Sequence, residues 1–296
     1  MGKFAKAETQ AASVVKALQK NGAIRSLVTA QNYTDCLTRV CRYAKENRFS
    51  LRELTPEQAL NYLNIRSEEV GQKSLDQERH AIQCMMQNLT GKLGENERLY
   101  PEKSEYQQIL KSRSYTAEQV ALVAAAQRDT NALSTAIAHA AGLRSHELLT
   151  LRRIEERSPS PDAITRALPA KFAGREGMRY TVKGKGGLVR EVVIPTSLAE
   201  RLEARRFESP QRVTDRNVHY GQHYDIAGGK RWAASFSAAS SRALGWSAGA
   251  HGVRHSYAQE RMNELQNSGL NRTHALEIVS QEMGHFRPEI TETYLR

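Results

Sequence analysis

Four short segments in the second half of the chain carry residue types that suit the chemistry of phosphate esters. The segment AGLRSHEL spaces an arginine and a glutamate by three positions, which would put them on one face of a helical turn. KGKGG is a glycine-rich turn with a central lysine, HGVRHSY again spaces a histidine and an arginine by three positions, and a later histidine precedes a tyrosine by nine positions. The candidate site residues are Arg144, Glu147, Lys185, His251, Arg254, His285 and Tyr294.

These residue types could break a phosphodiester bond without a metal ion. Arginine stays protonated and offers a planar fork of donors, so Arg144 and Arg254 suit the non-bridging oxygens of a phosphate. The phenol of Tyr294 becomes a nucleophile once a base takes its proton. In-line attack on phosphorus then depends on positioning and positive charge. The sequence therefore predicts an enzyme that needs no cofactor and no metal ion.

Each candidate taken alone has a structural explanation. Arg144 would be a surface charge, Lys185 a turn lysine and Tyr294 a packing aromatic. A zinc site at His251 and His255 is disfavoured, because glycine replaces the glutamate of the HExxH motif and no third ligand is evident. The KGKGG turn lacks the GxxxxGK[ST] spacing of a nucleotide-binding loop. Only the joint pattern is informative.

In order and spacing, the four segments resemble the tyrosine recombinases, a family that includes phage integrases and the Cre-like and Xer-like enzymes. That family has an arginine and an acidic residue in a G-L-R-x-x-E segment, a lysine in a β-hairpin, an H-x-x-R-H helix, a G-H dipeptide and a tyrosine nine residues beyond it. This sequence supplies all of these residues in the same order, between about Ser114 and Tyr294. The N-terminal region resembles the core-binding domain of such enzymes only in kind.

The resemblance implies a site-specific DNA recombinase or integrase that forms a 3′-phosphotyrosyl intermediate, as in the integration or excision of a mobile genetic element. Tyr294 would attack phosphorus, His251 would take its proton, and Glu147 would orient the catalytic groups. Lys185 would protonate the departing 5′ oxygen, and His285 would hydrogen-bond a phosphate oxygen. The covalent intermediate would keep the bond energy, so that a second 5′ hydroxyl could reverse the attack without ATP.

Two other functions stay open at this point. One is a DNA-binding accessory protein that acts on a partner recombinase, and the other is DNA relaxation of the type IB topoisomerase kind. Relatives commonly continue into a tail helix that docks on a neighbouring subunit of a tetramer, whereas this sequence ends at Leu295-Arg296. We expect a homo-oligomer, a tetramer on DNA. It would then assemble through another surface, or with a second recombinase or accessory protein. The remaining alternative is that the reading frame has lost its end.

For other residues near the motifs we expect structural or supporting roles. Tyr257 follows Arg254 by three positions, and we expect it to be packed in the core rather than to act as the nucleophile. We expect His255 to hydrogen-bond within the fold or to support the phosphate site. His219 and His223 lie in a polar region and are expected on the surface.

Composition indicates a polyanionic partner and a reducing compartment. The 296 residues include 43 lysines and arginines against 32 acidic residues, which gives a formal net charge of +11 and a pI of about 9.7. Because neutralised phosphates release condensed counterions, double-stranded DNA is the expected partner. The three cysteines form no CxxC pair, and the sequence shows neither an apolar leader nor the ~18 apolar residues of a membrane span. We therefore expect a cytoplasmic, nucleoid-associated protein without membrane contact.

The candidate residues must be positioned by a mainly helical fold with a small β-sheet. We expect residues 1–110 to form a helical DNA-binding (core-binding) domain and residues 111–296 to form an α+β catalytic domain of the tyrosine recombinase type. The stretch 91–113 is polar and interrupted by glycine and proline, as expected of an interdomain linker or its edge. The stretch 152–177 is either a solvated loop or an insertion that touches DNA.

Local patterns predict the individual elements. An apolar stripe predicts a helix over 29–47, and capping boxes predict helix starts at Thr55, Ser74 and Thr116. Residues on both sides of the KGKGG turn alternate in polarity, which predicts a β-hairpin that presents Lys185. Further helices are expected over 131–141, 232–244 and 253–265, and around Ala275 and Ile290.

Overall fold

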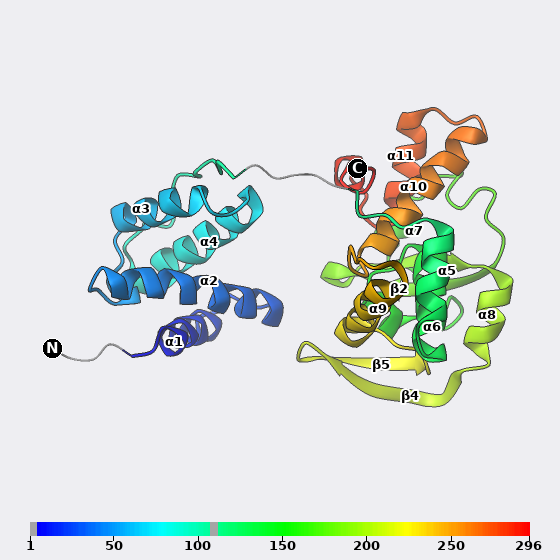
Figure 1. Cartoon of the computed structure of the whole chain (residues 1–296), viewed down its shortest axis with the longest axis horizontal. Helices are drawn as coiled ribbons and strands as arrows, with labels where there is room; N and C mark the ends of the chain where they lie inside the picture. The colour runs from blue at the N-terminus through cyan, green and yellow to red at the C-terminus, as the bar shows by residue number, and fades with distance from the viewer. Residues whose placement is uncertain (1–4, 107–111) are drawn as a thin grey trace. The chain divides into compact units, whose positions relative to one another are not determined.

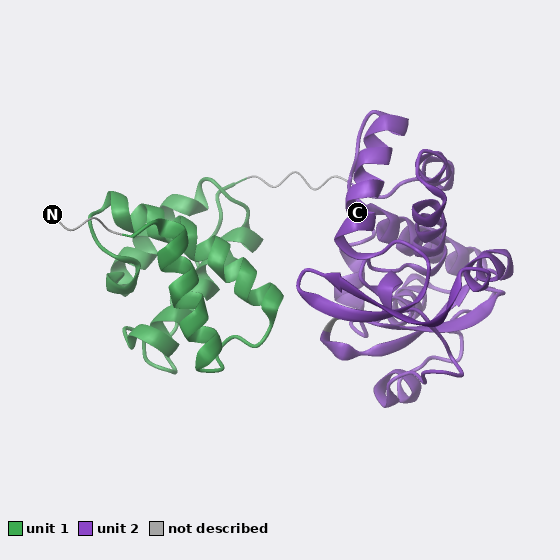
Figure 2. Ribbon diagram, turned by 90° about the horizontal axis from the view of Figure 1, so that it is seen from below, with its two compact units in different colours: residues 1–109 green, residues 110–296 purple. Residues whose placement is uncertain are grey.

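Two units, each with its own buried apolar residues, make up the chain. The computed structural model describes residues 5–106 and 112–296, with only the backbone at Lys185. Contacts divide the chain into unit 1, Met1–Ile109, and unit 2, Leu110–Arg296 (Figure 2). The predicted boundary between residues 110 and 111 lies outside the described residues.

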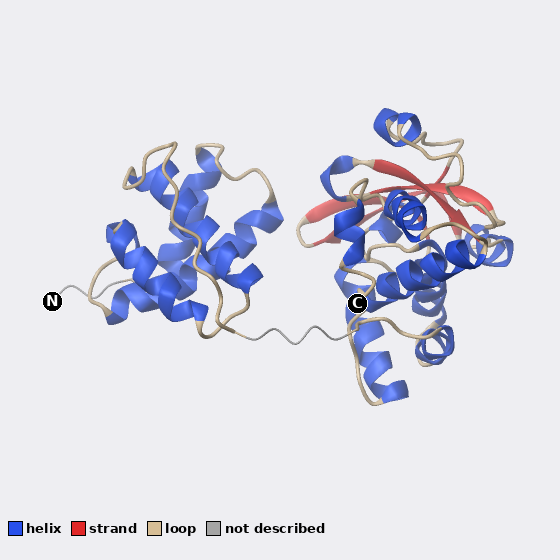
Figure 3. Ribbon diagram, turned by 90° about the horizontal axis from the view of Figure 1, so that it is seen from above, coloured by secondary structure: helices blue, strands red, loops and turns tan. Residues whose placement is uncertain are grey.

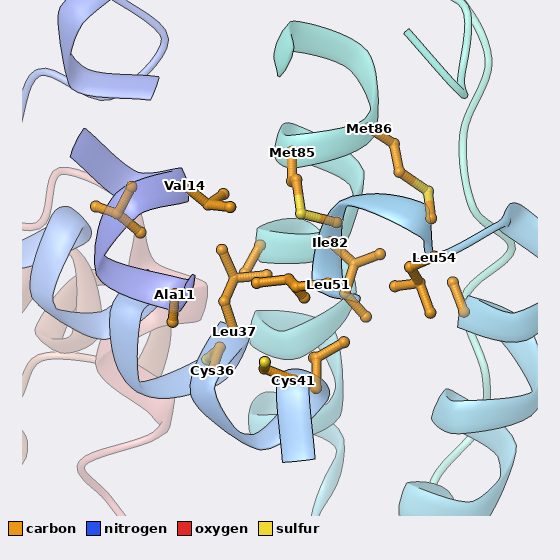
Figure 4. Packing of buried hydrophobic residues seen from close by; sticks show 14 of the residues in the cluster. Ala11, Val14, Cys36, Leu37, Cys41, Leu51, Leu54, Ile82, Met85 and Met86 are labelled. Atoms are coloured by element: carbon orange, nitrogen blue, oxygen red, sulfur yellow. The ribbon is translucent and has the colours of Figure 1, made fainter. Parts of the chain in front are cut away.

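Unit 1 is a helical bundle in which α2 packs against α1 and α4 (Figure 1). Leu37, Leu51 and Ile82 are fully buried in its interior (Figure 4). The predicted helix over 29–47 is confirmed as α2, whereas the first helix was not expected. The helices are α1 (Ala7–Lys20), α2 (Leu27–Glu46), α3 (Pro56–Ser67) and α4 (Gln72–Met85), with short turns η1 (Leu51–Glu53) and η2 (Met86–Thr90).

Capping boxes predicted two helix starts in unit 1. The start of α3 follows the local sequence, whereas the start of α4 depends on tertiary contacts. Thr55 and Gln58 form the predicted capping box at the start of α3. The predicted start at Ser74 is wrong, because α4 already begins at Gln72. The Gln72 side chain donates to the carbonyl of Glu102 and accepts from a backbone N–H in the same segment, both at 2.9 Å. These non-local bonds hold the first turn of α4 in place.

Most of the stretch predicted as a linker belongs to unit 1. Leu93 and Leu99 are buried in the same apolar cluster as Leu37. The Gln87 side chain donates to three carbonyls in this stretch, and the N–H of Glu105 donates to the Ser67 carbonyl. The glycines and charges that suggested a linker instead form a loop fixed to the bundle.

Unit 2 is built around α6, which packs against α5, α8, α9, α10 and β3 (Figure 1). The capping box at Thr116 is confirmed at the start of α5. No described helix is long and apolar enough to cross a membrane. The helices of this unit are α5 (Ala117–Ala125), α6 (Asp129–Ala141), η3 (Glu147–Thr150), α7 (Pro161–Thr165), α8 (Thr196–Glu203), α9 (Gly229–Leu244), α10 (Gly252–Asn267), α11 (Arg272–Glu282) and α12 (Pro288–Glu292).

The strands of unit 2 form two small antiparallel sheets (Figure 3). The first has the order β1-β2-β3, and its β2–β3 hairpin pairs Met178 with Ile194 and Lys183 with Val189, which confirms the predicted hairpin. The second is the hairpin β4–β5, which was not predicted. Strand β4 is mostly exposed and lacks a clear apolar face, although β5 alternates, and the two-residue turn uses Arg216 and Asn217, both at positive φ, without a glycine. The strands are β1 (Arg152–Arg153), β2 (Met178–Lys183), β3 (Val189–Ile194), β4 (Arg206–Asp215) and β5 (Val218–Tyr224).

The polar stretch 152–177 is not a solvated loop throughout. Phe172 is buried, and its N–H donates to Glu282 Oε1 at 2.8 Å. The N–H of Leu168 donates to Gln281 Oε1, also at 2.8 Å. The second half of this stretch therefore packs on the end of α11.

We expect Leu37→Ala to destabilise unit 1 by about 2–5 kcal/mol, because it leaves a cavity at a fully buried position. Leu27→Ala is the matched control, since Leu27 lies on the same helix and is 48% exposed. Its effect should stay within about 0.5 kcal/mol. Chemical denaturation of the full chain, followed by circular dichroism, measures both. Equal losses in the two variants would contradict the assignment of this core.

Candidate active site

Arg144 lies in the tight turn after α6 and Glu147 begins the short helix η3, so that the two residues stand one turn apart and share a face as predicted. Gly142 ends the helix in a left-handed conformation (φ 59°), and a Cβ there would stand 2.5 Å from the ring of Tyr257. The N–H of Arg144 donates to Glu147 Oε2 at 2.8 Å, and the N–H of Glu147 donates to the Arg144 carbonyl at 2.9 Å. The turn joins the two side chains, because Arg144 Nη1 donates to Glu147 Oε1 at 2.7 Å.

Three guanidiniums surround the carboxylate of Glu147, which is fully buried. Arg144 and Arg190 bind it at 2.7 and 2.8 Å, and Arg254 Nη1 lies 3.8 Å away. Burial alone would raise the pKa of Glu147, but the three positive charges outweigh it and hold that pKa well below its usual value. Glu147 is therefore an ionised group that links the arginines.

Arg190 belongs to this cluster although none of the sequence motifs includes it. On β3, Arg190, Val192 and Ile194 share one face and are all buried. Arginine is almost never fully buried unless it is paired. Its place on the apolar face of an alternating strand is the signal by which the sequence could have identified it.

Arg254 lies in the first turn of α10 and is fully buried. It donates to the carbonyls of Gly142 and Met283, and its Nη2 lies 3.1 Å from His285 Nε2. Its Nε has no hydrogen-bond partner among the described residues. Burial and the charge of Arg144 lower the pKa of Arg254, so the guanidinium lacks sufficient negative charge around it.

His285 follows α11 in a loop whose shape depends on Gly284. Gly284 has a φ of 71°, and a Cβ there would stand 2.6 Å from Arg190 Cδ. His285 Nδ1 lies 2.9 Å from the hydroxyl of Thr291, which is fully buried on α12. Thr291 thus fixes the plane of the imidazole, and no sequence motif indicated it.

Tyr294 lies just after α12 and packs against three histidine rings. Its ring centre lies 4.7 Å from that of His255, 5.2 Å from that of His285 and 5.4 Å from that of His251. The guanidinium carbon of Arg254 lies 5.7 Å from the same ring centre. The structure thus brings together six of the predicted site residues, all except Lys185, together with His255.

Contacts outside the site tie the segment that carries Tyr294 to its neighbours. Gln259 on α10 donates to the backbone carbonyl of Tyr294 at 3.1 Å. Arg272 at the start of α11 makes two bonds to the Glu292 carboxylate on α12, at 2.7 and 2.8 Å. Both partners of this ion pair are exposed enough for solvent to screen it.

The histidines around Tyr294 are held neutral by their surroundings. Desolvation and the nearby Arg254 lower the pKa of His251 to about 4, although part of this residue stays exposed. Burial and Arg113 lower the pKa of His255 to about 4, and burial and Arg254 lower that of His285 further. A neutral imidazole can accept a proton. An anion bound beside these rings would raise their pKa values toward neutral pH and make them stronger bases.

The hairpin that carries Lys185 begins beside the arginine cluster. The Lys185 side chain lies outside the described part of the structure, so its direction is not assigned. Gly184 precedes it, and a Cβ at Gly184 would stand 3.3 Å from Glu147 Oε1 and 3.7 Å from Arg144 Nη1. The base of the hairpin therefore lies against the site.

The remaining residues singled out by sequence have structural roles. Tyr257 is buried, as expected, and donates to Glu282 Oε2 at 2.8 Å. His219 is exposed, as expected, whereas His223 is partly buried and lies 3.9 Å from Glu156. Within residues 5–106 and 112–296, no group of three or more His, Cys, Asp or Glu residues could hold a metal ion.

The cluster as a whole can bind and polarise an anion. Three guanidiniums face one carboxylate, which leaves an excess of positive charge in a buried setting. The buried Nε of Arg254 has no hydrogen-bond partner among the described residues. A phosphate group would supply the missing acceptors and the missing negative charge.

We expect the ring signals of His251 in the free protein to stay those of the neutral form from pH 8 down to about pH 5.5. Its pKa is lowered to about 4 from the usual 6.5, so protonation begins only below this range. NMR titration measures it, with the signals assigned by their loss in His251→Gln. A titration midpoint near 6.5 would contradict the described environment.

No protein-family model matches the sequence, and no curated protein is similar to it. Several solved structures are nevertheless similar in fold. The XerH site-specific recombinase bound to its difH substrate is 16% identical with a TM-score of 0.57, over 100% of this chain and 95% of that chain. A lambda integrase(75-356) dimer bound to a COC′ core site is 15% identical with a TM-score of 0.59, over 97% and 94% of the two chains.

A third similar structure is the Tn1549 transposon integrase in complex with transposon right end DNA. It is 12% identical with a TM-score of 0.54, over 97% of this chain and 94% of that chain. These matches span both units, and the mainly helical architecture with small antiparallel sheets is common to them. The predicted fold class is confirmed, and the chain has the fold of the tyrosine recombinases.

Proposed function

We propose that this protein is a site-specific DNA recombinase that cleaves and rejoins DNA through a 3′-phosphotyrosyl intermediate. One observation carries the proposal: Tyr294, Arg254 and two candidate histidines share a site with an excess of buried positive charge. The fold, which is that of recombinases and integrases, supports the same function. Integration or excision of a mobile genetic element is the role we infer for it.

In this reaction, the two arginines would bind the scissile phosphate. Arg254 would use its unpaired Nε and Arg144 would use the part of its side chain that is not bound to Glu147, since 22% of that side chain is exposed. Developing charge on the phosphate oxygens would meet fixed donors in a site with little water. Glu147 would hold the arginines in place and would not contact DNA.

The bond changes balance without any further reagent. The Tyr294 oxygen forms a bond to phosphorus while the bond from phosphorus to the 5′ oxygen breaks. The phenolic proton passes to His251, and Lys185 supplies a proton to the departing 5′ oxygen. His285, whose Nε2 accepts from Arg254 in the free protein, would exchange that bond for one to a phosphate oxygen. Attack by a 5′ hydroxyl on the phosphotyrosine then reverses each step and rejoins a strand.

Double-stranded DNA is the partner we propose, because XerH and lambda integrase were crystallised with DNA sites and the chain carries a net charge of +11. In the same way, the lambda integrase dimer supports a homo-oligomer on DNA. We infer a tetramer, with a second recombinase or an accessory protein as an additional partner. Unit 1 would then contact DNA as a core-binding domain. The nucleoid of the cytoplasm is the expected location.

Tyr294→Phe should abolish covalent attachment to DNA, because it removes the only oxygen proposed to attack phosphorus. The substrate is a pool of nicked duplexes tiled across the DNA that flanks the gene, and adducts are detected by denaturing electrophoresis. Tyr257→Phe is the control and should keep the adduct, since the Tyr257 hydroxyl is bound to Glu282. An adduct with Tyr294→Phe, or none with the wild type on any duplex, would refute the proposal.

DNA binding should weaken steeply as salt increases. If the protein neutralises six or more phosphates, affinity should fall by roughly 10³-fold or more between 50 and 200 mM salt. Fluorescence anisotropy of a labelled duplex with Tyr294→Phe separates binding from cleavage. A flat salt dependence would rule out the proposed phosphate contacts.

A further inference from the structure

Arg190 is a buried arginine to which the proposed reaction assigns no role. It is only 1% exposed and lies on β3, five positions after Lys185 of the same hairpin. An arginine at such depth loses its hydration, and this loss must be offset by bonds to fixed partners. The partners that Arg190 does have are therefore informative.

The side chain of Arg190 joins three segments that are distant in sequence. Its Nη2 donates to Glu147 Oε2 at 2.8 Å and points toward the Gly142 carbonyl at 3.4 Å, both in the turn that carries Arg144. Its Nη1 donates to the Glu282 carbonyl at 2.5 Å, just before the loop that carries His285. The absence of a Cβ at Gly284 lets this loop close over Arg190 Cδ.

Each of these three segments holds a residue of the proposed reaction. The turn holds Arg144 and Glu147, the loop holds His285, and the strand continues directly into the Lys185 hairpin. A side chain that fixes all three sets their relative position. A misplacement of about 1 Å in such a site can cost roughly 10²-fold in rate.

We propose that Arg190 is a positioning residue for DNA cleavage, which couples the lysine hairpin to the arginines and to His285 through the carboxylate of Glu147. This inference rests on the proposed recombinase function. We assign Arg190 no contact with the phosphate, because both of its Nη atoms bind protein groups and its Nε, which has no partner among the described residues, lies under the loop at Gly284, 3.2 Å from where a Cβ would stand. It acts on the reaction only through the residues that it holds.

The alternative is a purely structural brace, and a second buried arginine provides the matched control. Arg261 is also 1% exposed, and it binds the carboxylate of Glu282 at 3.0 Å and the carbonyl of Ala173. It contacts none of the seven candidate residues among its described hydrogen bonds. Arg261→Met therefore removes a comparable buried ion pair and no hydrogen bond to a candidate residue; it shares Glu282 with Arg190, but through the carboxylate and not through the carbonyl.

The experiment compares Arg190→Met, Arg190→Lys and Arg261→Met in the full chain. Single-turnover adduct formation is measured at saturating DNA, on the nicked duplex that the wild type cleaves, together with the Kd for that duplex and the melting temperature. Arg190→Met should slow adduct formation on the order of 10²-fold with a Kd within about threefold of wild type. Arg190→Lys keeps the charge but lacks the planar fork of donors, so its rate of adduct formation should fall between the rates of the wild type and of Arg190→Met. Arg261→Met should lower the melting temperature at least as much but leave the rate within about threefold.

A double-mutant cycle tests whether the coupling passes through Glu147. In a Glu147→Gln background, Arg190→Met should add less than about threefold to the loss of rate, because the bond it acts through is already weakened. Additive losses, or equal rates for Arg190→Met and Arg261→Met, would overturn the assignment. If Arg190→Met does not fold, the double-mutant cycle is run with Arg190→Lys, and the same outcomes support or overturn the assignment. A wild type without any adduct refutes the recombinase function itself and this inference with it.

Discussion

The buried carboxylate of Glu147, with a guanidinium on each of three sides, is the interaction on which the rest of the site depends. Its partners come from its own turn, from β3 and from the first turn of α10, so one side chain fixes three elements. Removal of one partner from a buried pair costs about 3–5 kcal/mol, because the remaining charge has no compensation. The geometry of the site is therefore part of the stability of unit 2.

The same cluster contains more positive than negative groups, and these groups are out of contact with water. Such an arrangement is costly, and the charge of Arg254 adds to desolvation in lowering the pKa of His251. The site avoids still more charge by keeping its imidazoles neutral. A bound phosphate would offset the excess positive charge and would also make the histidines stronger bases. Affinity for the anion and the strength of the base therefore have the same electrostatic origin.

The sequence predicts those features that local chemistry decides. Thr55 and Thr116 cap their helices within three residues, and the β2–β3 hairpin follows from alternation around its glycines. Features decided by distant contacts escape it. The start of α4 depends on Gln72 bonding to a segment 30 residues away, and Arg190 meets a carboxylate 43 residues away. The β4–β5 hairpin has no glycine turn, and its strand β4 has no apolar face that would have indicated it.

The attachments of Tyr294 have a mechanical consequence. Its backbone is held by Gln259 and its preceding helix by a solvent-accessible Arg272–Glu292 pair, whereas the arginines of the site are fixed on other elements. A shift of α12 would carry the phenol away and release His285 from Thr291, but it would leave the arginines of the site where they are. For the proposed reaction, binding of the phosphate backbone and delivery of the attacking oxygen would then be separable, and the second could be withheld while the first persists.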